Sequence, residues 1–294
     1  MEIEDTHISQ MLNGHRETTD EDIIIATGIA EIDKQIEGFG MGELITLLGY
    51  PGDDKMNVAL RIMSYQAVDN SIPSAYFCTR ETPEIIARRL LCYRSSALHN
   101  RMLEYQITGE PSEWKDWVDK NKERIETSPV YLYPNERLSI DDICEECRLY
   151  AKKGVRMVYI YFPHDAISDD AVCKLKALAC QLYIAIILMI DVIGTRYGID
   201  GQQPCLHDLS WCQLDEYSDI VIGFFNCDTY GYVSEGGENI SGKMRIKVVK
   251  DRNNKQHEHF YLDYMGFIHK QYVEYSVASV EQIHSTEDPY NPFE

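Results

Sequence analysis

A short loop between a strand-like and a helix-like segment carries residues that could hold a phosphate group. It reads GYPGDDKM over residues 49–56 and follows an apolar run, ELITLL, over 43–48. Phosphate-binding loops have this setting and the pattern G-x-x-x-x-G-K-[ST], in which backbone N–H groups and the lysine hold phosphates and the hydroxyl binds Mg²⁺. The first glycine and the lysine are present. The candidate nucleotide-binding residues are Gly49, Pro51, Gly52, Asp53, Asp54, Lys55 and Met56.

Two positions of this GYPGDDKM loop depart from the pattern. Asp54 stands where the second glycine belongs, and Met56 stands where the hydroxyl belongs. A Cβ at position 54 hinders close approach of the backbone to a phosphate, and the carboxylates of Asp53 and Asp54 would repel it. Two unit charges ~4 Å apart repel by roughly 4 kcal/mol at an effective dielectric near 20. The loop therefore leaves two interpretations open, weak nucleotide binding and a tight turn that binds no nucleotide.

The segments around the loop alternate between strand-like and helix-like patterns. Short runs that are apolar on both faces predict buried strands over 43–48, 74–78, 130–132, 157–162, 184–190 and 220–225. Apolar spacing and capping residues predict helices over 58–68, 83–93, 139–154 and 170–182. Strands over 244–249 and 259–262 predict a hairpin around DRNNKQHE. We expect an α/β fold, with a mostly parallel sheet, helices on both faces and an antiparallel C-terminal edge hairpin.

Composition and charge narrow the function classes. The 294 residues include 28 Lys and Arg against 48 Asp and Glu, a formal net charge of −20. Such a chain repels polyanions, which argues for weak or no intrinsic DNA binding. No apolar run approaches the ~18 residues that span a bilayer, so we predict no membrane segment. The N-terminus lacks the pattern of a signal peptide and the nine cysteines lack framework spacing, which predicts reduced thiols and a cytoplasmic location.

The order of several motifs resembles the RecA-like ATPase domain of the DnaB family of replicative helicases. The motifs before and after the loop are TGIAEID (27–33), GFGMGEL (38–44), YFCTRET (76–82), IARRLL (86–91), LSIDDI (138–143), QPCLHDL (203–209), YSDIVI (217–222), KDRNN (250–254) and LDYMGF (262–267). They stand in the family's order over roughly residues 27–269. The resemblance implies a RecA-like P-loop domain over 27–275, preceded by an N-terminal arm (1–26) and followed by an acidic flexible tail (276–294).

The resemblance also implies that groups needed for ATP hydrolysis are replaced. Arg80 falls on the family's catalytic glutamate, and Tyr161 falls on the Walker B aspartate that holds Mg²⁺. Asp191 falls on its phosphate-sensing glutamine. Glu81 is next to Arg80, but we expect it to point to the opposite face of its strand. Each such loss commonly lowers a rate by ~10²–10³, so we do not expect hydrolysis. The resemblance makes ATP the candidate ligand. The missing hydroxyl and carboxylate argue against Mg²⁺.

Other candidate residues lie near the sheet's edges. His164 follows the strand over 157–162, where α/β sites form, so His164 and Asp191 are candidates for the edge of the site. In the family the hairpin that here carries Lys250 and Arg252 reaches the next subunit, which implies an intersubunit role for both; a basic patch on an exposed turn is the other interpretation. Cys144 and Cys147 have a C-x-x-C spacing but no second pair, so we predict structural thiols and no metal site.

The family contacts DNA through loops that face a ring channel. Here the corresponding loops over 193–204 and 226–242 contain one basic residue, Arg196, and several acids. Contacts to phosphates need Lys or Arg, so these loops do not predict a DNA translocase. The aromatic residues Tyr197, Tyr230 and Tyr232 could stack on bases, but ordinary packing is the preferred interpretation.

Three functions therefore stay open. The first is a DnaB-helicase-like protein with a degenerate nucleotide site, a non-hydrolysing assembly subunit or regulator linked to DNA replication. Its partners would be further copies of itself or a helicase-like protein. The second is an active ATP-dependent DNA helicase whose ligands are relocated to Glu81, Asp53 or Asp191. The third is a sensor that binds ATP without hydrolysing it.

Overall fold

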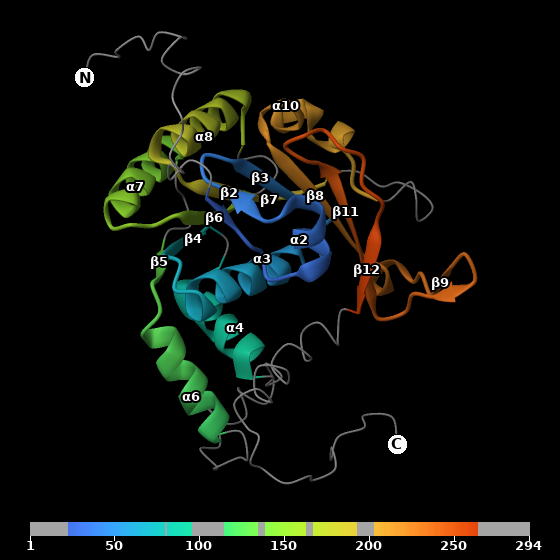
Figure 1. Cartoon of the computed structure of the whole chain (residues 1–294), viewed down its shortest axis with the longest axis horizontal. Coiled ribbons are helices and arrows are strands. Elements are labelled where there is room, and N and C mark those ends of the chain that lie inside the picture. The colour runs from blue at the N-terminus through green and yellow to red at the C-terminus, as the bar shows by residue number, and fades with distance from the viewer. Residues whose placement is uncertain are drawn as a thin grey trace, which may run out of the picture.

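The computed structural model describes residues 23–79, 81–95, 115–134, 139–162, 167–192 and 203–263 (Figure 1). Most of the predicted N-terminal arm and the whole predicted tail lie outside these residues, as do Arg80 and His164. No helix in the described part of the chain is both long enough and apolar enough to cross a bilayer.

The described residues form the following helices and strands. The strands are β1 (Ile24–Ile25), β2 (Phe39–Gly40), β3 (Leu44–Gly49), β4 (Ser74–Cys78), β5 (Val130–Pro134), β6 (Met157–Phe162), β7 (Ala185–Asp191), β8 (Ile220–Asn226), β9 (Ser234–Glu235), β10 (Glu238–Asn239), β11 (Lys243–Lys250) and β12 (Phe260–Asp263). The α-helices are α2 (Ala30–Ile36), α3 (Lys55–Met63), α4 (Pro83–Ser95), α6 (Lys115–Glu126), α7 (Ile140–Lys152), α8 (Asp169–Leu182) and α10 (Leu214–Tyr217). A π-helix, η2 (Ser64–Asp69), and two 3₁₀-helices, η4 (Leu206–Cys212) and η5 (Asp228–Tyr230), complete the set.

One large sheet runs through the middle of the described structure. Its strand order is β12-β11-β8-β3-β7-β6-β4-β5. The strands from β8 to β5 are parallel to their neighbours, whereas β11 pairs antiparallel with both β8 and β12. The predicted fold class, a mostly parallel α/β sheet with an antiparallel C-terminal hairpin, is confirmed.

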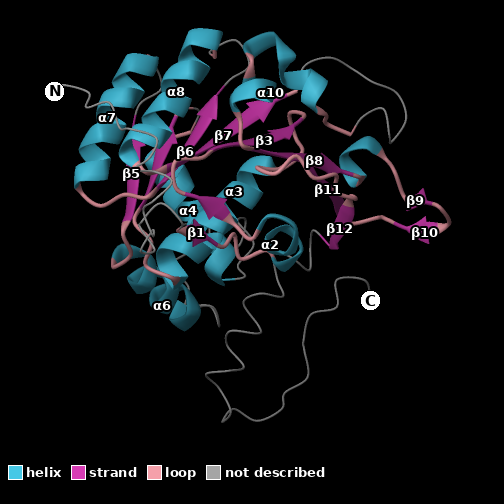
Figure 2. Cartoon of the chain, turned by 45° about the horizontal axis from the view of Figure 1, so that its top comes forward, coloured by secondary structure: helices cyan, strands magenta, loops and turns pink. Residues whose placement is uncertain are grey.

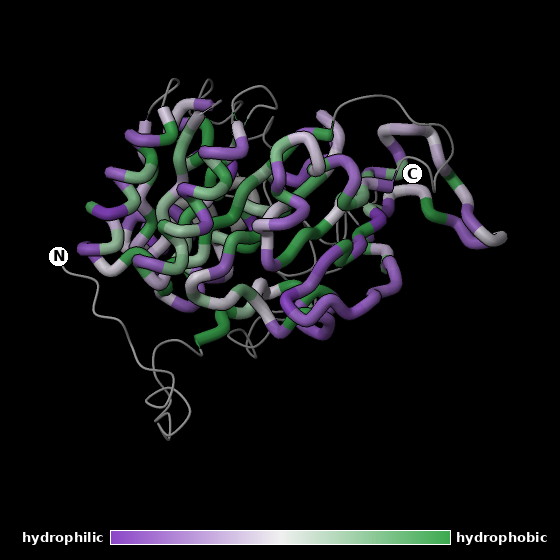
Figure 3. The backbone as a smooth tube through the Cα atoms, turned by 90° about the horizontal axis from the view of Figure 1, so that it is seen from above, coloured by the Kyte–Doolittle hydropathy of each residue, from purple (hydrophilic) through white to green (hydrophobic). Residues whose placement is uncertain are grey.

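Helices cover both faces of this sheet (Figures 1 and 2). α2, α3 and α4 pack on one face, where Leu47, Tyr159 and Met189 are buried. α7, α8 and α10 pack on the other face, over Leu48, Ile160 and Leu188. Because alternate residues of one strand enter different cores, the central strands are apolar throughout, and Figure 3 shows this apolar centre inside a more polar exterior.

Local sequence signals predicted several elements closely. The predicted strands over 74–78 and 157–162 have the observed bounds. Ser139 caps α7 as predicted, because its hydroxyl accepts the Asp142 N–H at 3.2 Å and the Asp142 carboxylate accepts the Ser139 N–H at 3.1 Å. These capping bonds fix where the helix begins.

The predicted helix over 58–68 is wrong in its bounds and its type. α3 already begins at Lys55, because Asp54 before it adopts a left-handed conformation at the end of the loop. After Met63 the chain widens into the π-helix η2, in which the Asn70 N–H donates to the Tyr65 carbonyl. In this segment the buried amide of Gln66 accepts a hydrogen bond of 2.5 Å from the Tyr159 hydroxyl.

Candidate functional site

The sheet register brings the GYPGDDKM loop next to the ends of β6 and β7. Gly49, the last residue of β3, lies opposite Asp191, the last residue of β7. Tyr161 on β6 lies opposite Met189, two residues before Asp191. Alternation along a strand places Asp191 and Met189 on the same face, which α3 covers. Residues from three separate strands therefore meet at the carboxyl ends of the parallel strands.

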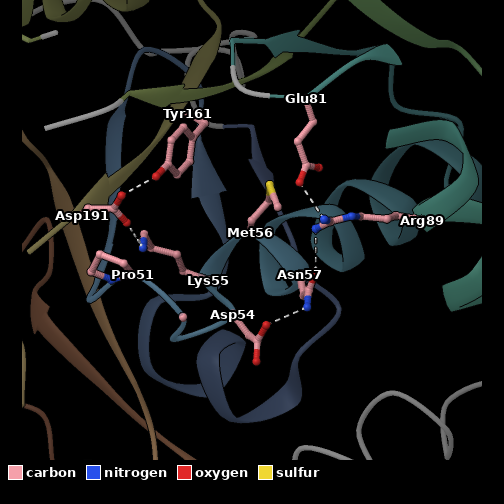
Figure 4. Close-up of a pocket in the computed structure, with 10 residues that line it drawn as sticks. Pro51, Asp54, Lys55, Met56, Asn57, Glu81, Arg89, Tyr161 and Asp191 are labelled. Carbon is pink, nitrogen blue, oxygen red and sulfur yellow. Dashed lines mark hydrogen bonds and ion pairs between the residues drawn. The ribbon is translucent and has the colours of Figure 1, made fainter. Parts of the chain in front are cut away.

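A cavity of about 240 Å³ lies at this meeting point (Figure 4). The described residues that line it are Pro51, Gly52, Asp54, Lys55, Met56, Asn57, Glu81, Arg89, Tyr161 and Asp191. Five of the seven predicted nucleotide-binding residues are among them. Gly49 and Asp53 are not among the lining residues that the structure describes, and a role for any of the seven in nucleotide binding stays a prediction.

The lysine of the loop is held by groups of its own chain. The Lys55 side chain is 5% exposed, and its ammonium donates to a carboxylate oxygen of Asp191 and, at 3.2 Å, to the Tyr50 carbonyl. The second oxygen of Asp191 accepts the Tyr161 hydroxyl. The charge of Lys55 is thus balanced without a phosphate, and Tyr161 helps to orient the carboxylate that balances it.

The backbone of the loop is left-handed at two positions, Gly52 and Asp54, and this conformation favours glycine. Asp54 has φ 53° and Gly52 has φ 95°, both in the left-handed region. A glycine adopts this conformation freely, and aspartate is one of the few other residues that do so. The Asp54 carboxylate accepts the side-chain amides of Asn57 at 2.9 Å and Asn226 at 3.1 Å. These two amides hold the carboxylate at the cavity wall.

Asp53 does not face the cavity, which corrects the expectation that its carboxylate lies beside the phosphates. Its side chain is fully buried and accepts the N–H groups of Tyr50 at 2.8 Å and Asn226 at 3.1 Å. Burial raises the pKa of Asp53 from 3.8 to about 6, although both N–H groups and Lys55 oppose the rise. Asp53 therefore ties the loop to the end of β8.

Glu81 lies on the cavity wall, so the expectation that it points to the opposite face is wrong. β4 ends at Cys78, and the alternation of a strand does not continue to residue 81. The Glu81 carboxylate pairs with the Arg89 guanidinium at 2.6 Å, and Arg89 also donates to the Asn57 side chain at 3.4 Å. In Figure 4 this chain of contacts runs along one wall, and the Tyr161–Asp191–Lys55 chain runs along the other, with Met56 between them.

Sequence reasoning missed Asn57, Arg89 and Asn226. The spacing could have predicted the contact of Asn57 with Asp54, since side chains three residues apart at the start of a helix lie close together. Arg89 lies two turns into α4, in the motif IARRLL, and no local pattern pairs it with Glu81. Asn226 is contributed by β8, and only the strand order reveals that β8 lies beside β3.

Lys250 and Arg252 both make contacts within the chain. Lys250 donates to the carbonyls of Asp215 and Glu216 at 2.9 and 3.0 Å, at the end of α10. Arg252 makes a two-pronged ion pair with Glu43, at 2.5 and 3.0 Å. Its guanidinium also donates to the carbonyls of Ile36, the last residue of α2, and of Gly38, just before β2. The predicted contact with a neighbouring subunit stays a prediction.

We expect the substitution Arg252→Ala to destabilise the fold by about 2 kcal/mol. It would leave Glu43, which is 13% exposed, and two carbonyls without their charged donor. Urea unfolding measures this effect, and Arg124→Ala is the control because Arg124 is 47% exposed in its pair with Asp69. Equal stability of the two variants would contradict the expectation. Sedimentation of the folded Arg252→Ala variant then tests assembly, and an unchanged value would remove the intersubunit role.

Part of the second candidate DNA loop packs into the protein. The Tyr230 ring stacks on Phe225 with centroids 4.8 Å apart, and Tyr232 lies 5.8 Å from the same ring. This agrees with the preferred interpretation that both tyrosines serve packing. The same segment contains η5, β9 and β10, whereas Tyr197 and most of the first candidate loop lie outside the described residues. Cys144 and Cys147 are buried on α7, in the core.

The family follows from a comparison of sequences. The profile of the family described as "DnaB-like helicase C terminal domain" matches residues 24–272. The chain belongs to this family. The fold agrees, because the ATPase domain of G40P superimposes on this DnaB-like chain with a TM-score of 0.75, at 18% identity, over 89% of this chain and 98% of that one. The predicted resemblance is confirmed.

Two curated relatives of this DnaB-like chain are replicative DNA helicases named DnaB. The protein of Leifsonia xyli subsp. xyli (strain CTCB07) is 22% identical over 78% of this chain and 51% of its own length. The protein of Treponema pallidum (strain Nichols) is 23% identical over 69% of this chain and 48% of its own. The chain thus spans about half the length of these relatives. A further solved structure, of a DnaB-like replicative helicase and its interactions with primase, has a TM-score of 0.71 at 18% identity and covers 88% of this chain and 65% of that one.

Proposed function

We propose that this chain is a non-hydrolysing member of the DnaB-like family that acts in DNA replication as an assembly subunit or a regulator. The observation that carries the proposal is the state of Lys55. Its ammonium is paired with Asp191, and the residue at the family's metal-binding position is a tyrosine that donates to the same carboxylate.

The chemistry of phosphoryl transfer explains the weight of this observation. Transfer to water requires a hydroxyl and a carboxylate on Mg²⁺, an acid that orients the water, and a cation on the phosphates. Met56 supplies no hydroxyl, Tyr161 supplies no carboxylate at its position, and Lys55 is already neutralised by Asp191. Each missing group lowers the rate of hydrolysis strongly. The loss of several groups together supports the proposal that this chain has the fold of the family but does not hydrolyse ATP.

The relatives suggest the setting in which such a chain would act. Two are replicative helicases, and one solved neighbour was described with its interactions with primase. We therefore propose assembly with further copies of this chain or with a helicase-like partner, and little DNA binding of its own because of its net charge of −20. A cytoplasmic location stays a prediction from the sequence.

One observation favours the alternative, an active helicase with relocated ligands. Asp191 and Glu81 both line the cavity, so two carboxylates lie where relocated ligands would be needed. Asp53, the third acid of that hypothesis, does not line the cavity, because its side chain is buried inside the protein. The two candidate functions differ in turnover.

The decisive measurement is phosphate release from ATP, with Mg²⁺ and with EDTA, in the presence of single-stranded DNA. We expect the wild-type protein to match its Lys55→Ala variant, with no release above the rate without protein. Mg²⁺-dependent release that Glu81→Gln abolishes would overturn the proposal and establish the helicase. Binding of ATP without release would instead favour the sensor that the sequence left open.

A further inference from the structure

The GYPGDDKM loop keeps donors that an anion needs. In the described part of the chain no acceptor takes the backbone N–H of Gly52, Asp54, Lys55 or Met56. These groups lie where the loop enters the nine-residue helix α3, whose N-terminal end carries a partial positive charge. Four backbone N–H groups of residues that line the cavity, together with a buried lysine, form a cradle that could bind an anion.

The lysine of this cradle donates to two acceptors of its own chain. Lys55 donates to the Tyr50 carbonyl and to Asp191, whose carboxylate is 14% exposed at the end of β7. That carboxylate offers two oxygens, one for Lys55 and one for the Tyr161 hydroxyl. In charge and in hydrogen bonding it resembles a terminal phosphate already bound between the lysine and β6.

From this geometry we infer that the cavity accepts a nucleoside diphosphate and excludes a triphosphate, because Asp191 stands in the place of the third phosphate. Lys55 would then bridge the second phosphate and Asp191. The inference rests on the proposed function, since a chain that turned over ATP would have to admit the third phosphate. A cavity of about 240 Å³ also suits the phosphate end of a nucleotide better than a whole drug-sized ligand.

The two loop carboxylates do not set this preference. Asp53 is turned into the protein, and Asp54 is held at the wall by two amides. Both charges weaken the binding of any phosphate chain. Asp191 differs because it pairs directly with Lys55 from the end of β7, and in this inference it occupies the place of the third phosphate. Repulsion between unit charges ~4 Å apart in a partly screened site corresponds to a roughly 10²–10³-fold loss of affinity.

The test is a pair of fluorescence titrations, with mant-ADP and with a non-hydrolysable mant-triphosphate, each with Mg²⁺ and with EDTA. We expect the wild-type protein to bind the diphosphate at least tenfold more tightly. Asp191→Asn keeps the shape and removes the charge, so it should raise triphosphate affinity roughly 10²-fold and diphosphate affinity by a smaller factor, because Lys55 is no longer neutralised. Asp54→Asn is the matched control, because it removes a charge from the lining of the same cavity and should strengthen both ligands while leaving their ratio unchanged.

The outcomes separate this inference from the proposed function. Equal affinity of the wild-type protein for both ligands, or binding of neither, would overturn the inference whatever the variants do. A loss of the ratio in Asp54→Asn as large as in Asp191→Asn would also overturn it. Phosphate release from ATP in the parallel assay would overturn the proposed function, and the titration with the non-hydrolysable ligand would still report the preference by itself. Circular dichroism of each variant confirms that it is folded before it is titrated.

Discussion

Replacing Lys55 by methionine should lower the free energy of unfolding by about 3 kcal/mol. In a working phosphate loop the lysine serves the ligand, but here it neutralises a carboxylate inside the protein. Lys55 and Asp191 are 5% and 14% exposed, and removal of one member of such a pair leaves the other charge with little water around it. Urea unfolding followed by circular dichroism, at pH 7.5 and moderate salt, measures the change.

A double variant and an exposed pair provide the controls for this result. In Lys55→Met with Asp191→Leu both charges are gone, so most of the lost stability should return. Lys174→Met removes a lysine that is 41% exposed and pairs with Asp141 and Asp170, and we expect a change below about 1 kcal/mol. A change in Lys55→Met as small as that in Lys174→Met would show that the pair contributes nothing to the fold.

The buried carboxylate of Asp53 should make stability fall as the pH rises from about 4 to about 6. Its pKa in the folded protein is about 6, above the ordinary 3.8, chiefly because burial disfavours the charge. Between these two values the folded protein binds a proton that the unfolded chain has released. The stabilisation is therefore complete below the lower value and lost above the upper one. The difference corresponds to about 3 kcal/mol.

The measurement compares the wild-type protein with Asp53→Asn at several pH values between 4 and 8. The asparagine cannot ionise, so the difference in unfolding free energy between the two proteins should change over this range and be constant above pH 7. Contributions of the other titratable groups cancel, except for those of Asp54, Lys55 and Tyr230, which lie close enough to interact with residue 53. A difference that does not vary with pH would mean that Asp53 titrates as an exposed carboxylate does.

Much of the fold could be predicted because its signals are local. The strand over 157–162 is apolar on both faces since it is buried between two helical layers, and that pattern is visible in six consecutive residues. Ser139 and Asp142 identify the start of α7 by their spacing alone. The edge hairpin followed from two strand-like runs around one polar turn.

The candidate site was less predictable because its contacts join distant strands. The loop sequence identifies Lys55 as a cation but not Asp191 as its partner, which depends on the register that places Gly49 opposite Asp191. Likewise, Asp53 and Asp54 look equivalent in the sequence. Only the tertiary structure shows that one is buried against Asn226 while the other lines the cavity. The backbone at Asp54 is left-handed, a conformation that favours glycine and that aspartate adopts more readily than most other residues.

The strand order has a consequence for how this chain is made. β3 is among the first strands to leave the ribosome, yet its neighbours in the sheet are β7 and β8, which are synthesised much later. Until β8 arrives, a strand that is buried on both faces in the finished protein lacks at least one of its two partners. A nascent chain that ends before residue 220 should therefore be a target for chaperones, and its loop should take shape only when β8 brings Asn226 to Asp53.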